Sequence, residues 1–461
     1  MKKFHNLYYI YILLFILYKI YIVNTKKVDI NVEDVVNLEN IITQTETGEN
    51  IILTFNEKYY DMSNLSSKII NIYVNSNVTF SGLKDGTVFD FKNKNNGLMN
   101  ISYLKNKKDI LKFENIIFKN CYEDVNISKG YMFTVNLSTD EVFLMYENCT
   151  FIDNRYSLFG LNINFYKPLN PDYVRILKTS VTNDLGIANE NIKIKFSYCN
   201  FKKDKGLFFI DLGRTEIDNC YFTEVDTLPY ESSNKESSIF YALLPTTLIL
   251  KNSFFENIKS ELPLFVAYKI YTNKYIFVED SLFSNTDVMF KGSRNKCEIL
   301  NTKFENYVIN KLLPGFIDTR LGYVNVTNTE FSNSKLMGGL FHEESTVYFQ
   351  NITIKNISTN HKGLIYSLYN NLEINGLEAT NITCYGESGD SSLILFDSNY
   401  VQKNLKLNDI NINNCHTNGP IIKIKGNSND VYINKLNITN VKSYGPLLDN
   451  LSDNVNYKLI I

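Results

Sequence analysis

The segment Val326–Phe341, VTNTEFSNSKLMGGLF, holds the arrangement that decides the fold. Phe331 is followed two residues later by Asn333, and a Gly pair then precedes Leu340. The same order of residue types recurs through most of the 461 residues of the chain. Self-similarity at a spacing of a few tens of residues is typical of solenoids, in which each repeat packs only on its neighbours.

The copies of this arrangement are mostly 21 to 33 residues apart, with one gap of 50. Aligned on Phe331, they begin at Phe113, Tyr146, Phe196, Ile217, Leu250, Val278, Ile299, Val326, Phe349, Ile374, Leu407 and Ile433. Apolar and other residues alternate at the start of each copy, as in a strand with one buried face. The third residue is usually Asn or Asp. After it, the apolar residues that alternate along the copy are displaced by one position. Because Asn tolerates turn geometry, this shift predicts a bend.

Each copy therefore predicts two strands joined by a tight bend, and the apolar run that follows predicts a third. These runs begin at Gly206, Pro263, Gly338, Gly363, Ser392 and Pro420. Three short strands per repeat describe an all-β fold, the right-handed parallel β-helix. We expect about twelve to fourteen three-stranded coils, stacked about 4.8 Å apart. Apolar residues at helical spacing within residues 31–45 predict a short N-terminal capping helix.

Equivalent side chains of successive coils should form two columns. A column expected inside the cylinder comprises Phe118, Phe151, Phe201, Phe222, Phe255, Phe283, Phe304 and Phe331. A second column, at the corner after it, comprises Asn257, Asn285, Asn306, Asn333, Asn356, Asn381, Asn414 and Asn440. We expect these Asn side chains to be largely buried and bonded to backbone or to neighbouring amides.

The pattern resembles the right-handed β-helix repeats of pectin-lyase-like proteins. It is especially similar to the Phe-x-x-Asn and Gly-Gly-apolar repeats of polymorphic outer membrane proteins and of related fungal secreted proteins. The closest matches are NCTFIDN from Asn148 and FSNSKLMGGLF from Phe331. The resemblance covers roughly residues 110–450 and implies the fold.

Three regions are expected along the chain. Residues 1–23 form a targeting segment, residues 26–110 the N-terminal cap and first coils, and residues 111–461 the β-helix repeats. The 50-residue gap between copies predicts a loop insertion near residues 162–191, and a degenerate coil is the alternative.

The first residues, MKKFHNLYYIYILLFILYKIYIV, have the layout of a secretory signal peptide: a charged start and a short apolar core. An uncleaved signal anchor is the alternative, and only this would tie the protein to a membrane. About a dozen Asn-x-Ser/Thr sequons follow; they include Asn64, Asn77, Asn126, Asn351, Asn381 and Asn437. We therefore expect a secreted or cell-surface protein, and the sequons are compatible with a glycoprotein.

The net charge of -2, with both signs scattered, does not favour nucleic-acid binding. Such binding needs a concentrated basic face. We therefore expect no nucleic-acid partner. The expected partners are extracellular polysaccharides or proteins.

Because many proteins of this architecture are polysaccharide lyases or hydrolases, the resemblance raises a carbohydrate-active enzyme as one hypothesis. The galacturonan hydrolases that this fold resembles use an Asn-Thr-Asp stretch, an Asp pair and a Gly-His-Gly stretch. Asn285, Thr286 and Asp287 match the first, and the other two are missing from the sequence. A lyase of this fold would need an acidic calcium cluster and a basic residue on one face.

Other candidate residues do not assemble into a motif. Asp211 and Arg214 match a fragment of the pectin esterase pattern, but the rest of that pattern is missing. We therefore expect these two residues at a solvated corner. His342, His361 and His416 have no predicted partners. No catalytic residue is assigned, and we expect no cofactor and no metal.

The seven cysteines show no zinc-site spacing. They are Cys121, Cys149, Cys199, Cys220, Cys297, Cys384 and Cys415. Several occupy the small inward position two residues before the Phe, which predicts buried core residues. Cys199 and Cys220 lie 21 residues apart at equivalent positions, so they are expected to be close enough for a disulfide if their coils are adjacent.

Two functional hypotheses follow. The first is a secreted, non-catalytic β-helix for adhesion or scaffolding; the second is a carbohydrate-active enzyme or polysaccharide-binding protein. A cluster of three or more exposed Asp or Glu with a Lys or Arg on one lateral sheet would favour the second. The final residues repeat the start of a coil, with Val455 and Tyr457 expected opposite Val431 and Ile433. An open coil there predicts either that the sequence is a fragment of a longer chain or that this end associates with a partner or a second copy.

Overall fold

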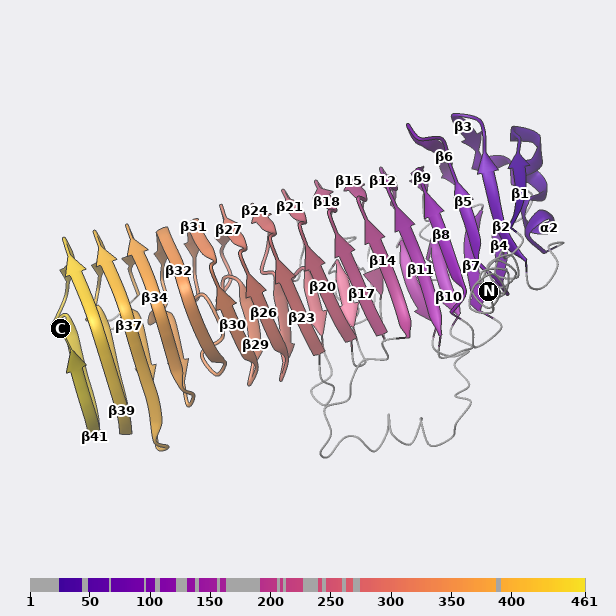
Figure 1. The fold of residues 1–461 in the computed structure, drawn as a ribbon. Coiled ribbons are helices and arrows are strands. Elements are labelled where there is room, and N and C mark those ends of the chain that lie inside the picture. The colour runs from indigo at the N-terminus through magenta and orange to yellow at the C-terminus, as the bar shows by residue number, and fades with distance from the viewer. Residues whose placement is uncertain are drawn as a thin grey trace, which may run out of the picture.

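The computed structural model describes residues 25–460 apart from 44–48, 66–67, 95–96, 104–107, 122–130, 137–140, 156–157, 163–190, 205–207, 210–212, 227–238, 243–245, 259–262, 268–273 and 387–390. Its strands lie in successive layers along one long axis, from the N-terminal elements at one end to β41 at the other (Figure 1). Every strand pairing is parallel and joins one coil to the next. The chain is a right-handed parallel β-helix, as the repeat predicted.

Each coil contributes one strand to each of three lateral faces. The first face is built by β1 (Thr25–Ile30), β2 (Asn50–Phe55), β5 (Val78–Ser81), β8 (Ile110–Glu114), β11 (Val142–Glu147), β14 (Ile192–Ser197), β17 (Gly213–Asp218), β20 (Thr246–Lys251), β23 (Lys274–Glu279), β26 (Lys296–Leu300) and β30 (Tyr323–Thr327).

The second face is reached through the tight bend after each of these strands. It comprises β3 (Tyr59–Asp61), β6 (Thr87–Lys94), β9 (Ile116–Cys121), β12 (Thr150–Ile152), β15 (Asn200–Lys202), β18 (Tyr221–Thr223), β21 (Phe254–Glu256), β24 (Leu282–Ser284), β27 (Lys303–Glu305) and β31 (Glu330–Leu336).

The third face closes each coil. It comprises β4 (Ile69–Val74), β7 (Leu98–Tyr103), β10 (Phe133–Asn136), β13 (Phe159–Asn162), β16 (Phe208–Phe209), β19 (Phe240–Ala242), β22 (Phe265–Ala267), β25 (Phe290–Ser293), β29 (Ile317–Arg320), β33 (Gly363–Leu368) and β36 (Ser392–Asp397).

In the last coils, long strands run round the corners from one face to the next. These are β32 (Thr346–Thr359), β34 (Leu372–Thr380), β37 (Lys403–Asn413), β39 (Ile422–Thr439) and β41 (Leu448–Ile460). Short strands after the second corner add a small ladder; they are β28 (Val308–Ile309), β35 (Thr383–Cys384), β38 (His416–Thr417) and β40 (Lys442–Ser443).

The N-terminal cap contains helix, as expected for residues 31–45, but in two short pieces. A 3-10 helix, η1 (Val32–Asn37), leads into α2 (Leu38–Thr43), and a further turn, η2 (Met62–Asn64), follows later. Leu38 and Ile42 are buried against the first coils. The Glu39 carboxylate accepts a hydrogen bond of 2.8 Å from the amide of Asn71 on β4, which fixes the cap on the third face.

The aromatic column lies inside the cylinder. All eight Phe residues from Phe118 to Phe331 in this column are at most 1% exposed. Successive rings stack with centroids 4.4 to 5.2 Å apart and planes within 12° of parallel. Ile354, Ala379, Ile412 and Ile438 continue the column in register.

The expectation that the second-corner Asn column is buried was wrong. All eight residues from Asn257 to Asn440 in this column are exposed. Each has a positive φ, between 50° and 62°, and this left-handed corner turns its side chain outward. The following residue then points inward, as Ile258 and Ile382 do. The amides nevertheless bond along the column: Asn381 donates to Asn356 at 2.9 Å and accepts from Asn414 at 2.6 Å.

The loop insertion expected near residues 162–191 falls mainly outside the described residues. The strands on either side of it, β11 and β14, pair directly with each other, and so do β12 and β15. The coils that these strands belong to are therefore neighbours in the stack.

The register expected for the last coil was wrong by two residues. Tyr457 rather than Val455 pairs with Val431, and Leu459 pairs with Ile433. The reason is that β41 runs without interruption from the third face onto the first, so its register is set by pairings that begin at Leu448. End-to-end association through this coil stays a prediction.

We expect Phe283→Ala to lower the free energy of unfolding by about 3–5 kcal/mol, because it removes a fully buried ring from the middle of the stack. Chemical denaturation followed by circular dichroism measures this loss. The exposed Phe254, on the outer side of β21, provides the control substitution Phe254→Ala. A loss below about 1 kcal/mol for Phe283→Ala would contradict the packing.

Asn381→Ala should cost about 2–3 kcal/mol, because alanine is strained at a φ of 56° and both inter-coil bonds are lost. Asn381→Gly relieves the strain and removes only the bonds, so its loss should be about half as large. Equal losses for the two variants, in the same denaturation assay, would show that the left-handed corner contributes nothing.

A buried carboxyl, Asp204, should make stability depend on pH. Burial raises its pKa to about 8, although it accepts hydrogen bonds from the backbone and amide of Asn154 at 3.1 and 3.0 Å. The folded pKa lies above the unfolded one, so this group favours the folded state most below about pH 4 and loses that contribution as the pH rises towards about 8.

Asp204→Asn removes the ionisable group and keeps its shape. We expect the melting temperature of this variant, relative to the unmodified protein, to rise steadily between about pH 4 and pH 8. Asp153, at the exposed corner next to Asn154, carries a charge that helps to raise the pKa of Asp204, so Asp153→Asn should weaken this pH dependence without abolishing it. A constant difference for Asp204→Asn would show that Asp204 stays ionised in the folded protein.

Candidate functional site

The outer side of the first face carries a gathering of aromatic and charged side chains on four neighbouring strands. Inward and outward residues alternate along each strand, so every strand contributes two or three outward side chains. We define the first-face patch as the charged and aromatic outward residues of β17, β20, β23 and β26: Arg214, Glu216, Asp218, Lys251, Tyr275, Phe277, Glu279, Lys296 and Glu298.

Two aromatic rings form the centre of the patch. Tyr275 and Phe277 are two residues apart on β23, and their ring centroids are 6.4 Å apart with an angle of 31° between the planes. Lys251, on the preceding coil, places its ammonium group 5.1 Å from the Phe277 centroid. Lys296, on the following coil, lies 5.5 Å from the Tyr275 centroid. Both rings are therefore bordered by positive charge, an arrangement favoured by the electron-rich ring face.

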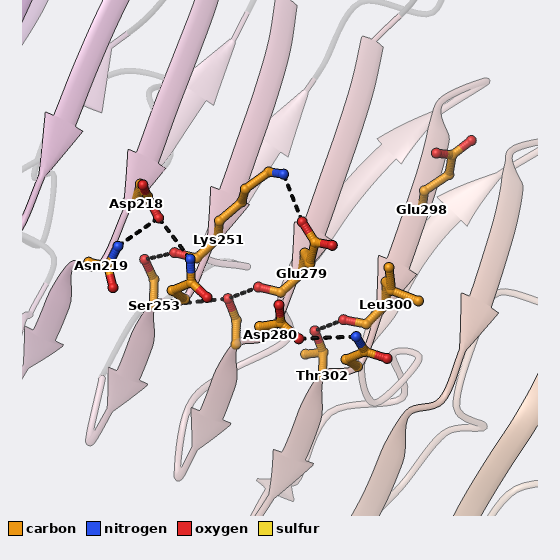
Figure 2. Close-up of polar contacts among 12 residues, drawn as sticks. Asp218, Asn219, Lys251, Ser253, Glu279, Asp280, Glu298, Leu300 and Thr302 are labelled. Atoms are coloured by element: carbon orange, nitrogen blue, oxygen red, sulfur yellow. Dashed lines mark hydrogen bonds and ion pairs between the residues drawn. The ribbon is translucent and has the colours of Figure 1, made fainter.

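The carboxylates of the patch are paired with these cations. Lys251 contacts Glu279 at 2.7 Å, as Figure 2 shows. Lys296 contacts Glu298 at 2.6 Å, and the Tyr275 hydroxyl donates to the other oxygen of Glu298 at 2.7 Å. Each contact crosses from one coil to the next or links outward positions of one strand, so the register of the coils creates the network.

Electrostatics in the patch favour ionised carboxylates. Burial by itself would raise the pKa of Glu298, but the hydrogen bonds from Lys296 and Tyr275 outweigh it and lower that pKa. The same holds for Glu216, where Lys193 at 2.9 Å and Arg214 at 2.6 Å lower the pKa against the effect of burial. Desolvation and the bond to Glu298 raise the pKa of the Tyr275 hydroxyl. The ion pairs thus favour the charged form of Glu216 and Glu298.

A polar corner supports the patch from the side. Ser253, Ser281 and Thr302 are buried, and each donates to the backbone carbonyl two residues earlier at 2.6 to 2.8 Å (Figure 2). The carbonyls belong to the ends of the patch strands, at Lys251, Glu279 and Leu300. Outside them, the Asp218 carboxylate accepts hydrogen bonds from Asn219 and Asn252 at 3.0 and 2.9 Å.

The motif-derived candidates do not come together in one place. Asn285 is a corner residue, and the Thr286 hydroxyl points inward to the Tyr307 hydroxyl at 2.8 Å. Asp211 lies outside the described residues, whereas Arg214 belongs to the patch rather than to a solvated corner.

Two histidines expected to lack partners do have them. The His342 Nδ1 accepts from the backbone N–H of Glu344 at 3.2 Å. The His361 Nδ1 lies 3.1 Å from the Gly363 carbonyl oxygen and must donate, since a carbonyl can only accept. Both contacts are local and fix the ring orientation.

All seven cysteines are buried, as expected, and all are free thiols in this structure. Cys149, Cys199 and Cys220 follow one another on adjacent coils, because β12, β15 and β18 pair in that order. Burial and the neighbouring thiols raise the pKa of Cys199 well above its ordinary range. These thiols are packing residues of the first corner.

The sequence reasoning missed the patch because outward positions do not repeat. The inward residues of each coil recur in type, but Tyr275, Lys296 and Glu298 have no counterparts in most copies. Their alternation on β23 and β26 was visible, and aligning the strands in register would have placed them together.

Two further structural findings concern sites of other kinds. Among the described residues, no group of three or more His, Cys, Asp or Glu side chains is arranged to hold a metal ion. None of the helices in the described part of the chain is both long and apolar enough to cross a membrane.

Comparison with known proteins gives little beyond this. No family model matches the chain, and no curated protein matches it. Among solved structures, it is similar to a PL6 family alginate lyase, AlyGC, with 9% sequence identity and a TM-score of 0.20, over 94% of this chain and 100% of the other. Because the sequence identity and the TM-score are both this low, the function is argued from the chain's own residues.

Proposed function

We propose that this protein is a secreted or cell-surface, non-catalytic β-helix that binds an extended polysaccharide along its first face. The observation that carries the proposal is the centre of the patch, where Tyr275 and Phe277 face outward between ammonium groups of both neighbouring coils. Secretion is expected from the N-terminal residues 1–23 and is part of the proposal.

The chemistry of a sugar polymer suits this surface. A pyranose ring has an apolar face of C–H groups, which packs on aromatic rings, and a rim of hydroxyls, which both donate and accept hydrogen bonds. The patch offers rings in its middle and both lysine donors and carboxylate acceptors at its edge. Because the face is straight and regular along the helix axis, successive sugar units can lie across successive coils.

The state of the carboxylates supports binding rather than hydrolysis. A general acid for glycosidic cleavage needs a carboxyl group whose pKa is raised, so that it holds a proton near neutral pH. The pKa of Glu298 and that of Glu216 are lowered instead by direct ion pairs. These groups can accept hydrogen bonds from sugar hydroxyls but lack a proton to donate.

One observation keeps an enzyme as the second candidate. Glu216, Glu279 and Glu298 lie on one lateral sheet together with Lys251 and Lys296, although the three carboxylate side chains are only 14%, 24% and 29% exposed. This half-buried cluster falls short of the exposed one that would favour a carbohydrate-active protein. Incubation with pectins, other polyuronides and neutral glucans separates the two candidates. Retarded migration in polysaccharide gels without new reducing ends or unsaturated products supports binding alone, and turnover of any polymer would overturn the non-catalytic assignment.

The N-terminal segment has its own test. Expression of the full chain with its native leader in a eukaryotic host should deliver the protein to the medium or the cell surface. Retention of the chain in the cytosol would contradict secretion without bearing on the patch.

Tyr275→Ala should weaken polysaccharide binding about 5- to 30-fold, which corresponds to about 1–2 kcal/mol for one stacking ring. Calorimetric titration with the polymer that gels identify measures the change. Tyr400→Ala is the matched control, because Tyr400 is 80% exposed and lies in a turn away from the patch. Equal affinities of the two variants would remove the patch as the binding surface.

A further inference from the structure

The fold separates the glycosylation sequons by what their amides do. The Asn residues of eleven Asn-x-Ser/Thr sequons lie in the described part of the chain. In seven of them the amide nitrogen, which is the atom that receives a glycan, donates a hydrogen bond to another coil; these are Asn100, Asn136, Asn148, Asn351, Asn356, Asn381 and Asn437. A sugar attached to such a nitrogen would replace one of its two hydrogens and would therefore compete with the bond between coils.

Asn325 differs from these structural sequons. It lies in the middle of β30, it is half-buried, and its amide makes no hydrogen bond among the described residues. Its sequon partner Thr327 is two residues further on the same strand, so both side chains face outward. The amide nitrogens of Asn64, Asn77 and Asn450 also donate no hydrogen bond in the described structure. Asn64 lies in the short helical turn η2, and the side-chain oxygens of Asn77 and Asn450 accept from the backbone N–H of Ile110 and Ser452.

Two tyrosines flank Asn325 on the outer face. Tyr323 is two residues earlier on β30 and is 43% exposed. Tyr348, on the next coil, is the direct register partner of Asn325. The two rings lie 5.1 Å apart between centroids, with 33° between their planes. A group attached to the Asn325 amide therefore emerges beside an aromatic pair.

We propose that Asn325 is an N-glycosylation site whose first sugar packs on the rings of Tyr323 and Tyr348. The sugar is an N-acetylhexosamine-type residue with an apolar face, supplied by a lipid-linked oligosaccharide diphosphate. The inference rests on the secretory route that forms part of the proposed function, and it goes beyond that function because it assigns a modification outside the patch.

The transfer step balances as follows. The Asn325 amide nitrogen forms a bond to C1 of the donor's first sugar, while the bond between C1 and the diphosphate oxygen breaks. The lipid diphosphate leaves with the bonding electron pair, and the amide nitrogen loses one proton to a base of the transferase. No oxidant or reductant takes part. The amide keeps its second hydrogen.

The position has a consequence for the first face. β30 follows β26, the last strand of the patch, so a glycan at Asn325 borders the patch on the next coil. It covers an aromatic pair that is otherwise exposed, and it leaves Tyr275 and Phe277 two coils away.

The test expresses the full chain behind a host secretion leader in insect cells, which guarantees entry into the secretory pathway. Glycopeptide mapping then measures occupancy at each sequon. We expect Asn325 to be occupied in most molecules and the seven bonded sequons to be largely empty. Secreted protein with an unmodified Asn325 would overturn the proposal, whatever the outcome of the polysaccharide assays.

Melting temperatures test whether the first sugar packs on the rings of Tyr323 and Tyr348. Thr327→Ala removes the glycan without changing Asn325 and should lower the melting temperature by about 1–4 °C in insect-cell protein. In bacterial protein, which has no glycan, the same substitution should have no comparable effect. The glycan-dependent shift should vanish in a Tyr323→Ala/Tyr348→Ala background, and Asn64→Gln is the control for a glycan away from aromatic rings. A glycan-dependent change in melting temperature that persists without the two tyrosines would disprove the packing of the sugar on their rings.

Discussion

The parallel hydrogen bonding between coils, in strict register, is the constraint on which the rest of this structure depends. Once one strand pairs with the same strand of the next coil, each residue lies about 4.8 Å from its equivalent. Like side chains must then pack on like, and the sequence satisfies this with flat rings. Phe201 and Phe222, only 4.4 Å apart between centroids, show how closely the rings follow the backbone spacing.

The same spacing decides what happens to polar side chains. An amide at a corner can donate to the amide of the preceding coil and accept from the amide of the next one, so the exposed Asn side chains from Asn333 to Asn414 bond to one another. A single carboxyl group at an inward position is not fully satisfied by hydrogen bonds in this way. Asp204 receives hydrogen bonds only on one oxygen among the described residues, and its other oxygen is buried without a partner. A proton on the carboxyl resolves this conflict at neutral pH.

Much of the fold was predictable because the inward residues repeat. Alternation and the parity shift at Asn gave the strands, the first bend and the Phe column. The orientation of the second Asn column was not predictable from periodicity. Simple alternation along a strand would place these Asn side chains inward, but their left-handed backbone conformation at the corner turns them outward. The patch was not predictable either, since coils of unequal length must be aligned before Lys251, Tyr275 and Lys296 become neighbours.

This division between inward and outward residues explains where function can arise on such a scaffold. Inward positions are committed to packing by the register, and corner positions are committed to the Asn columns. Only the outward positions of the lateral faces are left to vary. On the first face, Tyr275 and Phe277 occupy such positions and leave their rings partly exposed to solvent. Exposed rings occur elsewhere on the chain, as at Tyr400, so what distinguishes Tyr275 and Phe277 from that ring is the ammonium group that the neighbouring coils place beside each of them. The proposed polysaccharide ligand would pack the apolar faces of its sugars on these rings, and its hydroxyls would meet the charges around them.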